Sequence, residues 1–253
     1  MDFCRAGRSR FSATASWGGR ILTPASDLDL VLVADHGRCE FSDGAKPLPP
    51  PLWFARLAQR LLSALTSPTA SGDLYQVDMR LRPMGAKGPI VSSLDGFIAY
   101  HQNEAWHWET LALTRARVIT AIATEPNHKA LAFEQQTSAG LAAVIETPRN
   151  AALLKQAVIE MAAMVHQSHP PRHELDCKYR VGGAFDLDFI CQYLVLIWAP
   201  CHQGLAEVPE SSLDLLDRLH RGGALTETQN HALKAACEFY QSLQLLLRLT
   251  VGG

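Results

Sequence analysis

Three aspartates have the residue type and spacing best suited to chemistry in this chain. Asp27 and Asp29 open the run DLDLVLVA (27–34), a short apolar stretch that reads as a buried strand. Residues two apart share one face of a strand, so this pair would place two carboxylates about 7 Å apart along one edge. Two such anions repel each other unless a cation lies between them. The pattern therefore predicts a site for Mg²⁺, which prefers a few carboxylate oxygens together with substrate phosphates.

A third aspartate, Asp78, lies in LYQVDMRLR (74–82), where apolar and polar residues alternate. This alternation predicts a strand with one apolar face and one charged face that includes Asp78. If this strand pairs with strand 27–34, the three carboxylates converge. Such a site suits two-metal nucleotidyl transfer, in which one ion activates the attacking hydroxyl and the other holds the triphosphate.

Residues beside the aspartates could bind the phosphates. Arg80 and Arg82 share the charged face with Asp78, so they could neutralise phosphate or instead pair with the aspartates. Upstream, Gly18 and Gly19 would let backbone amides approach a phosphate, because glycine has no side chain to block it. A lone Asp-x-Asp is a weak signal that usually marks a strand end or loop. The ordered set of Gly-Gly, Asp-x-Asp and a later aspartate is far more specific.

The composition excludes several classes of function. The net charge of −2 provides no positive field to gather nucleic acid, so no nucleic-acid partner is expected. No apolar run approaches the roughly 20 residues that cross a bilayer, and the opening residues lack the apolar middle of a signal peptide. We therefore expect a cytoplasmic protein without membrane contact. The six cysteines include no Cys-x-x-Cys pair, which predicts reduced thiols rather than a zinc ribbon.

The remaining periodicities predict mixed structure followed by helices. Residues 1–16 show neither a strand period nor a helix period, so they are expected to be irregular. Strand signals nearly vanish after about residue 150. Helices are predicted from apolar spacing and from proline and glycine punctuation at 51–66, 106–120, 150–168, 186–199, 212–220 and 226–249.

The ordered glycine and aspartate set resembles the pattern of the DNA polymerase β-like nucleotidyltransferase superfamily. Nearly everything after residue 17 resembles glutamine synthetase adenylyltransferase, through GGRILTPASDLDLVLV, DLYQVDMRLRPMGAKGPIVSSLDGFIAYHQ and KYRVGGAFDLDFICQYLVLIWA. That family carries two similar halves, one adding AMP to a tyrosine of glutamine synthetase and one removing it by phosphorolysis. NEAWHWETLALTRAR and FICQYLVLIWA resemble the C-terminal, adding half more closely. The removing half is the nearer alternative.

The resemblance implies an α+β fold class. A polymerase β-like nucleotidyltransferase domain, with a small mixed sheet and helices, would be followed by an all-α helical bundle. The expected boundaries are an irregular segment at 1–16, the nucleotidyltransferase domain at 17–124, a linker at 125–147 and the bundle, an accessory domain, at 148–253.

The resemblance also assigns roles to residues. Asp27 and Asp29 would bind two Mg²⁺ ions, and Asp78 would complete the metal site and help to activate the incoming tyrosine hydroxyl. A second group would shape the ATP pocket or face the triphosphate: Gly18, Gly19, Ser26, Arg80 and Arg82. Glutamine synthetase would be the protein substrate, and a PII-type signalling protein a further partner.

Other charged residues have structural readings. Asp186 and Asp188 form a second Asp-x-Asp, but at the start of a predicted helix, where residues two apart do not share a face. Helix capping and domain contact are therefore preferred over a second metal site. For Glu109, Arg115 and Arg117, in a stretch that resembles the family, ion pairing is at least as well supported as ligand contact.

Two departures from the family pattern predict a fragment. FSATASW stands where the family has a buried apolar strand before Gly18, and Ile21 replaces an expected acidic residue. The chain also stops at LRLTVGG, short of the usual family end. A missing strand would weaken the sheet beneath the metal site. A third hypothesis is therefore an inactive fragment that acts as a binding module through its helices.

Overall fold

A computed structural model describes residues 10–16, 27–37, 39–70, 72, 76–123, 127–171, 173, 175–207, 209 and 211–250. The chain divides into two compact units. The sheet-containing unit includes Pro24–Ala105 and Ala116–Val144, and the helical unit includes Trp106–Arg115 and Ile145–Gly253. The described helices include none that combines the length and apolar composition needed to span a bilayer.

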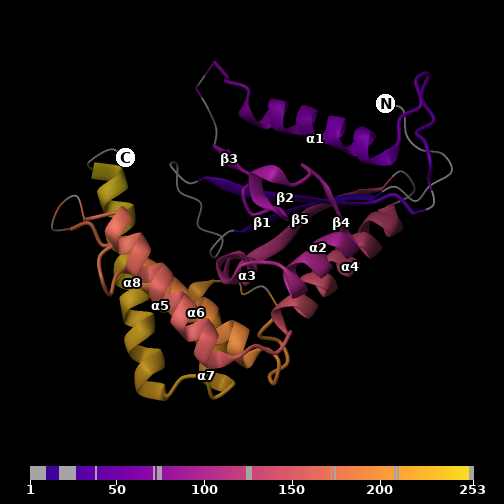
Figure 1. The fold of residues 1–253 in the computed structure, drawn as a ribbon. Helices are drawn as coiled ribbons and strands as arrows, with labels where there is room; N and C mark the ends of the chain where they lie inside the picture. Colours follow the sequence, from indigo (N-terminus) through magenta and orange to yellow (C-terminus); the bar gives the residue numbers. More distant parts are fainter. Residues whose placement is uncertain are drawn as a thin grey trace. The chain divides into compact units, whose positions relative to one another are not determined.

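A mixed sheet of five strands forms the centre of the first unit (Figure 1). Four strands follow the order β3-β2-β1-β5, and β4 also pairs with β2. β1 is antiparallel to β2 and β5, whereas β3 and β4 run parallel to β2. The strands are β1 (Arg10–Ser16), β2 (Leu28–Asp35), β3 (Val77–Asp78), β4 (Ser92–Ser93) and β5 (Ala116–Ala123). The predicted small mixed sheet is therefore observed.

β1 corrects the expectation of an irregular segment at 1–16 for its described part, residues 10–16, while residues 1–9 lie outside the described residues. Arg10–Ser16 is an inner strand, paired on one side with β2 and on the other with β5. The weak apolar pattern of FSATAS hid this strand, because strand formation depends more on pairing with neighbours than on intrinsic preference. The strand expected to be missing is thus present.

Two other predicted elements have different bounds. The helix predicted at 106–120 stops early, as α3 (His107–Leu113), and β5 begins at Ala116. β5 contains Val118, Ile119, Thr120 and Ile122, β-branched residues that favour strands. The strand predicted at 74–82 is shorter: β3 covers Val77–Asp78, and a turn follows from Arg80.

Helices cover both faces of the sheet (Figure 1). α1 (Pro50–Thr66) lies on one face, while α2 (Leu94–Asn103) and α4 (Asn127–Ile145) lie on the other. The predicted helix at 51–66 is confirmed by α1. α4 occupies most of the predicted linker and belongs to the first unit up to Val144. Gly140 permits the contact between α4 and α2, because a Cβ there would lie 2.6 Å from Cδ1 of Ile98.

The face beneath α1 is the apolar core that orients β2. Alternate residues of β2 pack against two residues of α1 and against Met79, which follows β3. The buried cluster consists of Leu30, Leu32, Ala34, Phe54, Ala58 and Met79. Since successive residues of a strand point to opposite faces, Asp29 points away from this cluster. The core thereby decides which face of the sheet presents the carboxylate.

The second unit consists of helices among its described residues. It contains α3, α5 (Ala151–Ser168), α6 (Ala184–Trp198), α7 (Ser212–Arg221) and α8 (Glu227–Thr250), close to the predicted helices after residue 150. α6 contacts each of the other four helices and is apolar on most sides, as expected for a central helix.

The second Asp-x-Asp has the structural role that was preferred. An Asp186 oxygen accepts a hydrogen bond from the Gly182 amide at 2.7 Å, and the other lies 2.9 Å from Nε2 of His166. Asp188 forms an ion pair with Arg115 at 2.9 Å. Glu109 accepts a hydrogen bond from the Trp106 amide at the start of α3. These side chains hold the helical unit together.

The cysteine prediction is wrong at one position. Cys177, Cys191 and Cys237 are buried free thiols and Cys201 is an exposed one, as expected. Cys39 is instead disulfide-bonded. Sequence spacing cannot reveal such a bond, because it depends on which cysteines the fold brings within bonding distance.

Replacing Phe54 by alanine tests the core between α1 and the sheet. Phe54 is 4% exposed, so its truncation should lower the free energy of unfolding by about 3–5 kcal/mol through lost burial and a new cavity. Urea unfolding followed by circular dichroism measures this loss. Leu52→Ala, an exposed residue of the same helix, is the control and should change stability little. Equal losses for the two variants would contradict the assigned core.

Candidate functional site

Asp29 and Asp78 lie side by side on neighbouring parallel strands. Leu28 pairs with Val77 and Asp29 with Asp78, and the Leu28 amide donates a 2.7 Å hydrogen bond to the Gln76 carbonyl. Adjacent strands are about 4.8 Å apart, so the two aspartates are immediate neighbours. The predicted pairing of these two chain segments is confirmed.

Asp27 adds a third negative charge at this edge. It is exposed and lies one residue before β2, whereas Asp29 and Asp78 are half-buried. All three carboxylates act on one guanidinium: Arg80 has its pKa raised by hydrogen bonding and charge from Asp78 first, and also by the charges of Asp29 and Asp27. The fold thus brings the three aspartates into one electrostatic environment.

Arg80 makes the closest contacts to Asp78. One carboxylate oxygen accepts the Arg80 backbone amide at 2.8 Å, and the other accepts Nε at 2.6 Å and pairs with Nη2. Burial alone would raise the pKa of Asp78, but the hydrogen bonds from Arg80 and the charges of Arg80 and Arg82 outweigh it and lower the pKa. Asp78 is therefore an anion at neutral pH.

Arg82 supports the loop that follows β3. Its guanidinium donates hydrogen bonds to the backbone carbonyls of Met79 at 2.8 Å, Ala86 at 3.3 Å and Gly88 at 3.4 Å. Gly88 also closes this loop, since a Cβ there would lie 1.8 Å from the Pro83 carbonyl oxygen. This structural role of Arg82 was not predicted from the sequence, although RPMGAKG, rich in glycine and proline, signals a turn. The contact of Arg82 with a triphosphate stays a prediction.

The predicted nucleotide-binding residues are only partly placed. Gly18, Gly19 and Ser26 lie outside the described residues, so their assignment remains a prediction. Arg80 is described, on the turn after β3 rather than in a strand. Its guanidinium faces Asp78, which is the second of the two alternatives raised for it.

The donor chemistry of the aspartates fits Mg²⁺, although their side chains are not arranged around an ion. In the part of the chain that is described, no three His, Cys, Asp or Glu side chains form a group that could hold a metal. Asp78 instead directs both oxygens at Arg80. The paired aspartates still offer hard carboxylate oxygens from two adjacent strands, the ligand type that Mg²⁺ prefers. Positive charge beside Asp78 comes from Arg80 and Arg82.

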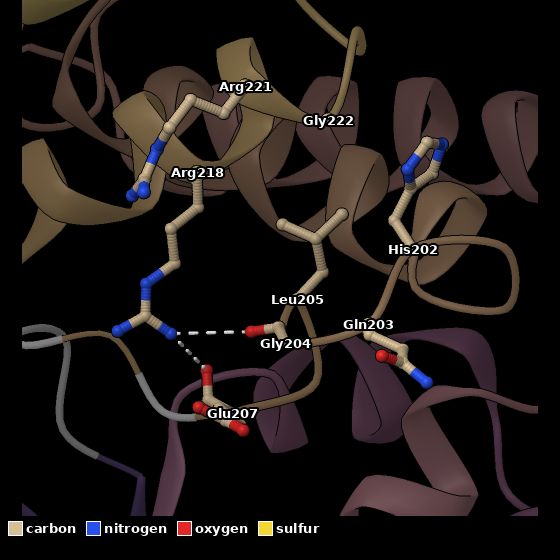
Figure 2. Close-up of a pocket in the computed structure, with 8 residues that line it drawn as sticks. All are labelled: His202, Gln203, Gly204, Leu205, Glu207, Arg218, Arg221 and Gly222. Atoms are coloured by element: carbon tan, nitrogen blue, oxygen red, sulfur yellow. Dashed lines mark hydrogen bonds between the residues drawn. The ribbon is translucent and has the colours of Figure 1, made fainter.

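A separate pocket of about 380 Å³ lies in the helical unit (Figure 2). It is lined by polar residues that include His202, Glu207, Arg218 and Arg221. Arg218 donates hydrogen bonds to the backbone carbonyls of Gly204 and Glu207, at 3.3 and 3.4 Å, and pairs with Asp214 at 2.8 Å. This arginine is thus already neutralised and holds the loop. The pocket contains none of the predicted site residues.

The segment that holds the three aspartates is similar to a known protein family. Residues 14–134, which include all three aspartates, match the family model described as Glutamate-ammonia ligase adenylyltransferase. The chain is 42% identical over 240 residues to a bifunctional glutamine synthetase adenylyltransferase/adenylyl-removing enzyme of Rhodopseudomonas palustris strain TIE-1. It is 40% identical to the proteins of the same name from Bradyrhizobium diazoefficiens and Brucella suis. These alignments cover 92–94% of this chain but 23% of each relative.

Replacing Arg80 by glutamine should raise the pKa of Asp78, since burial then acts without the opposing ion pair. Carbon NMR titration of the aspartate carboxyls measures this shift, and Lys87→Gln, in the same loop, is the control. Because the folded pKa lies below the ordinary value of 3.8, the pair stabilises the fold above that pH, and this contribution is lost as the pH falls through the folded pKa. An unshifted Asp78 resonance would contradict the assigned pair.

Proposed function

We propose that this chain transfers AMP from ATP to a tyrosine of glutamine synthetase, using two Mg²⁺ ions. The observation that supports it most directly is the in-register pairing of Asp29 with Asp78, beside Asp27, within the segment that matches the adenylyltransferase family model. The chain spans about a quarter of the length of its relatives, so the reaction of those proteins enters here as a proposal.

The aspartates would act as anionic ligands on a fixed frame. In the proposed reaction the tyrosine oxygen bonds to the α-phosphorus of ATP, and the bond to the departing pyrophosphate breaks. The Mg²⁺ ions would lower the pKa of the attacking hydroxyl and neutralise the triphosphate. Asp78 would complete the metal site and help to activate the tyrosine hydroxyl, as the family resemblance implies. Asp29 and Asp27 supply the remaining carboxylate charge.

The adding reaction is preferred over the removing reaction on sequence resemblance alone. NEAWHWETLALTRAR includes α3 and, two residues beyond its end, the partly buried Arg115, which pairs with Asp188. This contact does not distinguish the two reactions, because both would use the same carboxylates with different nucleophiles: tyrosine for adding and phosphate for removing. A PII-type signalling protein as partner and a cytoplasmic location belong to the same proposal.

Transfer of labelled AMP to unmodified glutamine synthetase tests the proposed site. Asp29→Asn and Asp78→Asn should each reduce transfer at least about a hundredfold, because each removes a charge that would bind the cation. Asp43→Asn, at an exposed loop position of the same unit, should keep wild-type activity. Retained transfer in both site variants would refute the proposed role of these carboxylates.

A second assay separates the two directions of the reaction. Incubating the chain with adenylylated glutamine synthetase and inorganic phosphate should release little ADP if the adding reaction is correct. Rapid phosphate-dependent release, lost in Asp78→Asn, would assign the removing reaction to the same site.

The third hypothesis is an inactive fragment that acts as a binding module through its helices. It rested on a missing strand, and β1 occupies the middle of the sheet. Isothermal calorimetry distinguishes it from both enzyme reactions: a folded chain with a cooperative unfolding transition that binds no Mg²⁺-ATP would favour the binding module.

A further inference from the structure

We infer that Arg80 competes with the divalent cation for the Asp78 carboxylate, and is therefore a positioning residue that couples metal binding to triphosphate binding. The inference rests on the proposed function. In the structure both oxygens of Asp78 accept hydrogen bonds from Arg80, one from its amide and one from Nε. A cation that binds Asp78 must replace at least the side-chain contact.

The two arginines of the loop differ in how readily they can move. The Arg80 side chain is 79% exposed, and its described hydrogen bonds go to Asp78. Arg82 is partly buried and donates to three backbone carbonyls of the loop. Rotation of the Arg80 side chain therefore breaks one ion pair and moves an already exposed guanidinium into solvent, whereas rotation of Arg82 would leave three carbonyl contacts unmade. Arg80 is the mobile member of the pair.

Charge balance makes the exchange favourable. Asp78 is in register with Asp29, Asp27 lies one residue before β2, and Arg80 pairs with Asp78, so the Arg80 guanidinium lies beside a cluster of carboxylates. A divalent cation brings more positive charge to these carboxylates than the guanidinium of Arg80 does. The released guanidinium stays tethered two residues from Asp78, beside the position proposed for the triphosphate, and its planar fork suits phosphate oxygens. Cation binding and triphosphate binding then favour each other.

Opposite changes in two affinities would identify this exchange. Mn²⁺ binding without nucleotide, measured by calorimetry, should tighten about three- to fivefold in Arg80→Gln, the range expected for loss of an exposed ion pair. Mg²⁺-ATP binding should weaken about tenfold in the same variant, because a phosphate contact is lost. A purely structural role for Arg80 would weaken both.

Matched variants separate competition from general charge loss. Arg60→Gln removes one positive charge from an exposed position on α1 and should leave Mn²⁺ affinity unchanged. Arg80→Lys keeps the charge but loses the planar fork, so its Mn²⁺ affinity should fall between those of wild type and Arg80→Gln. Thermal unfolding checks that each variant is folded.

Three outcomes decide the matter. Tighter Mn²⁺ binding and weaker Mg²⁺-ATP binding in Arg80→Gln, with Mn²⁺ binding lost in Asp78→Asn, supports the exchange. Unchanged or weaker Mn²⁺ binding in Arg80→Gln, with the same dependence on Asp78, overturns the inference and leaves the proposed function standing. Absence of any Asp78-dependent Mn²⁺ binding in the wild type overturns the proposed function itself, and the inference with it.

Discussion

The repulsion between Asp29 and Asp78 is the constraint on which this site depends. Parallel pairing of β2 with β3 sets the two residues in register, so their carboxylates are neighbours whatever rotamers they adopt. Positive charge must compensate them, and Arg80 provides it from the turn that follows β3. In the proposed reaction, Mg²⁺ would take over from Arg80 the neutralisation of the Asp78 carboxylate. This ion pair is suited to such a replacement, because its arginine side chain is exposed and can turn into solvent.

The rest of the first unit maintains that register. α1 buries the apolar face of β2 and leaves the aspartate face to the other side of the sheet. Arg82 and Gly88 close the loop behind β3, so Arg80 leaves the strand in a fixed direction. β1 pairs with β2 along most of its length and supplies the inner strand of the sheet. These contacts lie away from the reacting groups, yet each determines where a carboxylate or guanidinium lies.

The two units of the chain support the proposal to different degrees. The aspartates, the sheet and the family match at residues 14–134 fall mainly in the first unit. The helical unit is similar to the same relatives through the longer alignments, and its charged residues make structural contacts such as Arg115 with Asp188.

The sequence by itself determined the apolar strand after Asp27, helix α1, the helices after residue 150 and the choice of three aspartates, because local periodicity and short motifs carry that information. Only the tertiary structure decided that FSATAS is an inner strand and that residues 116–123 form a strand instead of extending the predicted helix. It also decided that Arg80 pairs with Asp78 while Arg82 holds a loop. Strand pairing and the partner of a long charged side chain depend on residues far apart in the chain. Hydrophobic spacing gives no measure of such distances, so those features emerge only when the sheet is assembled.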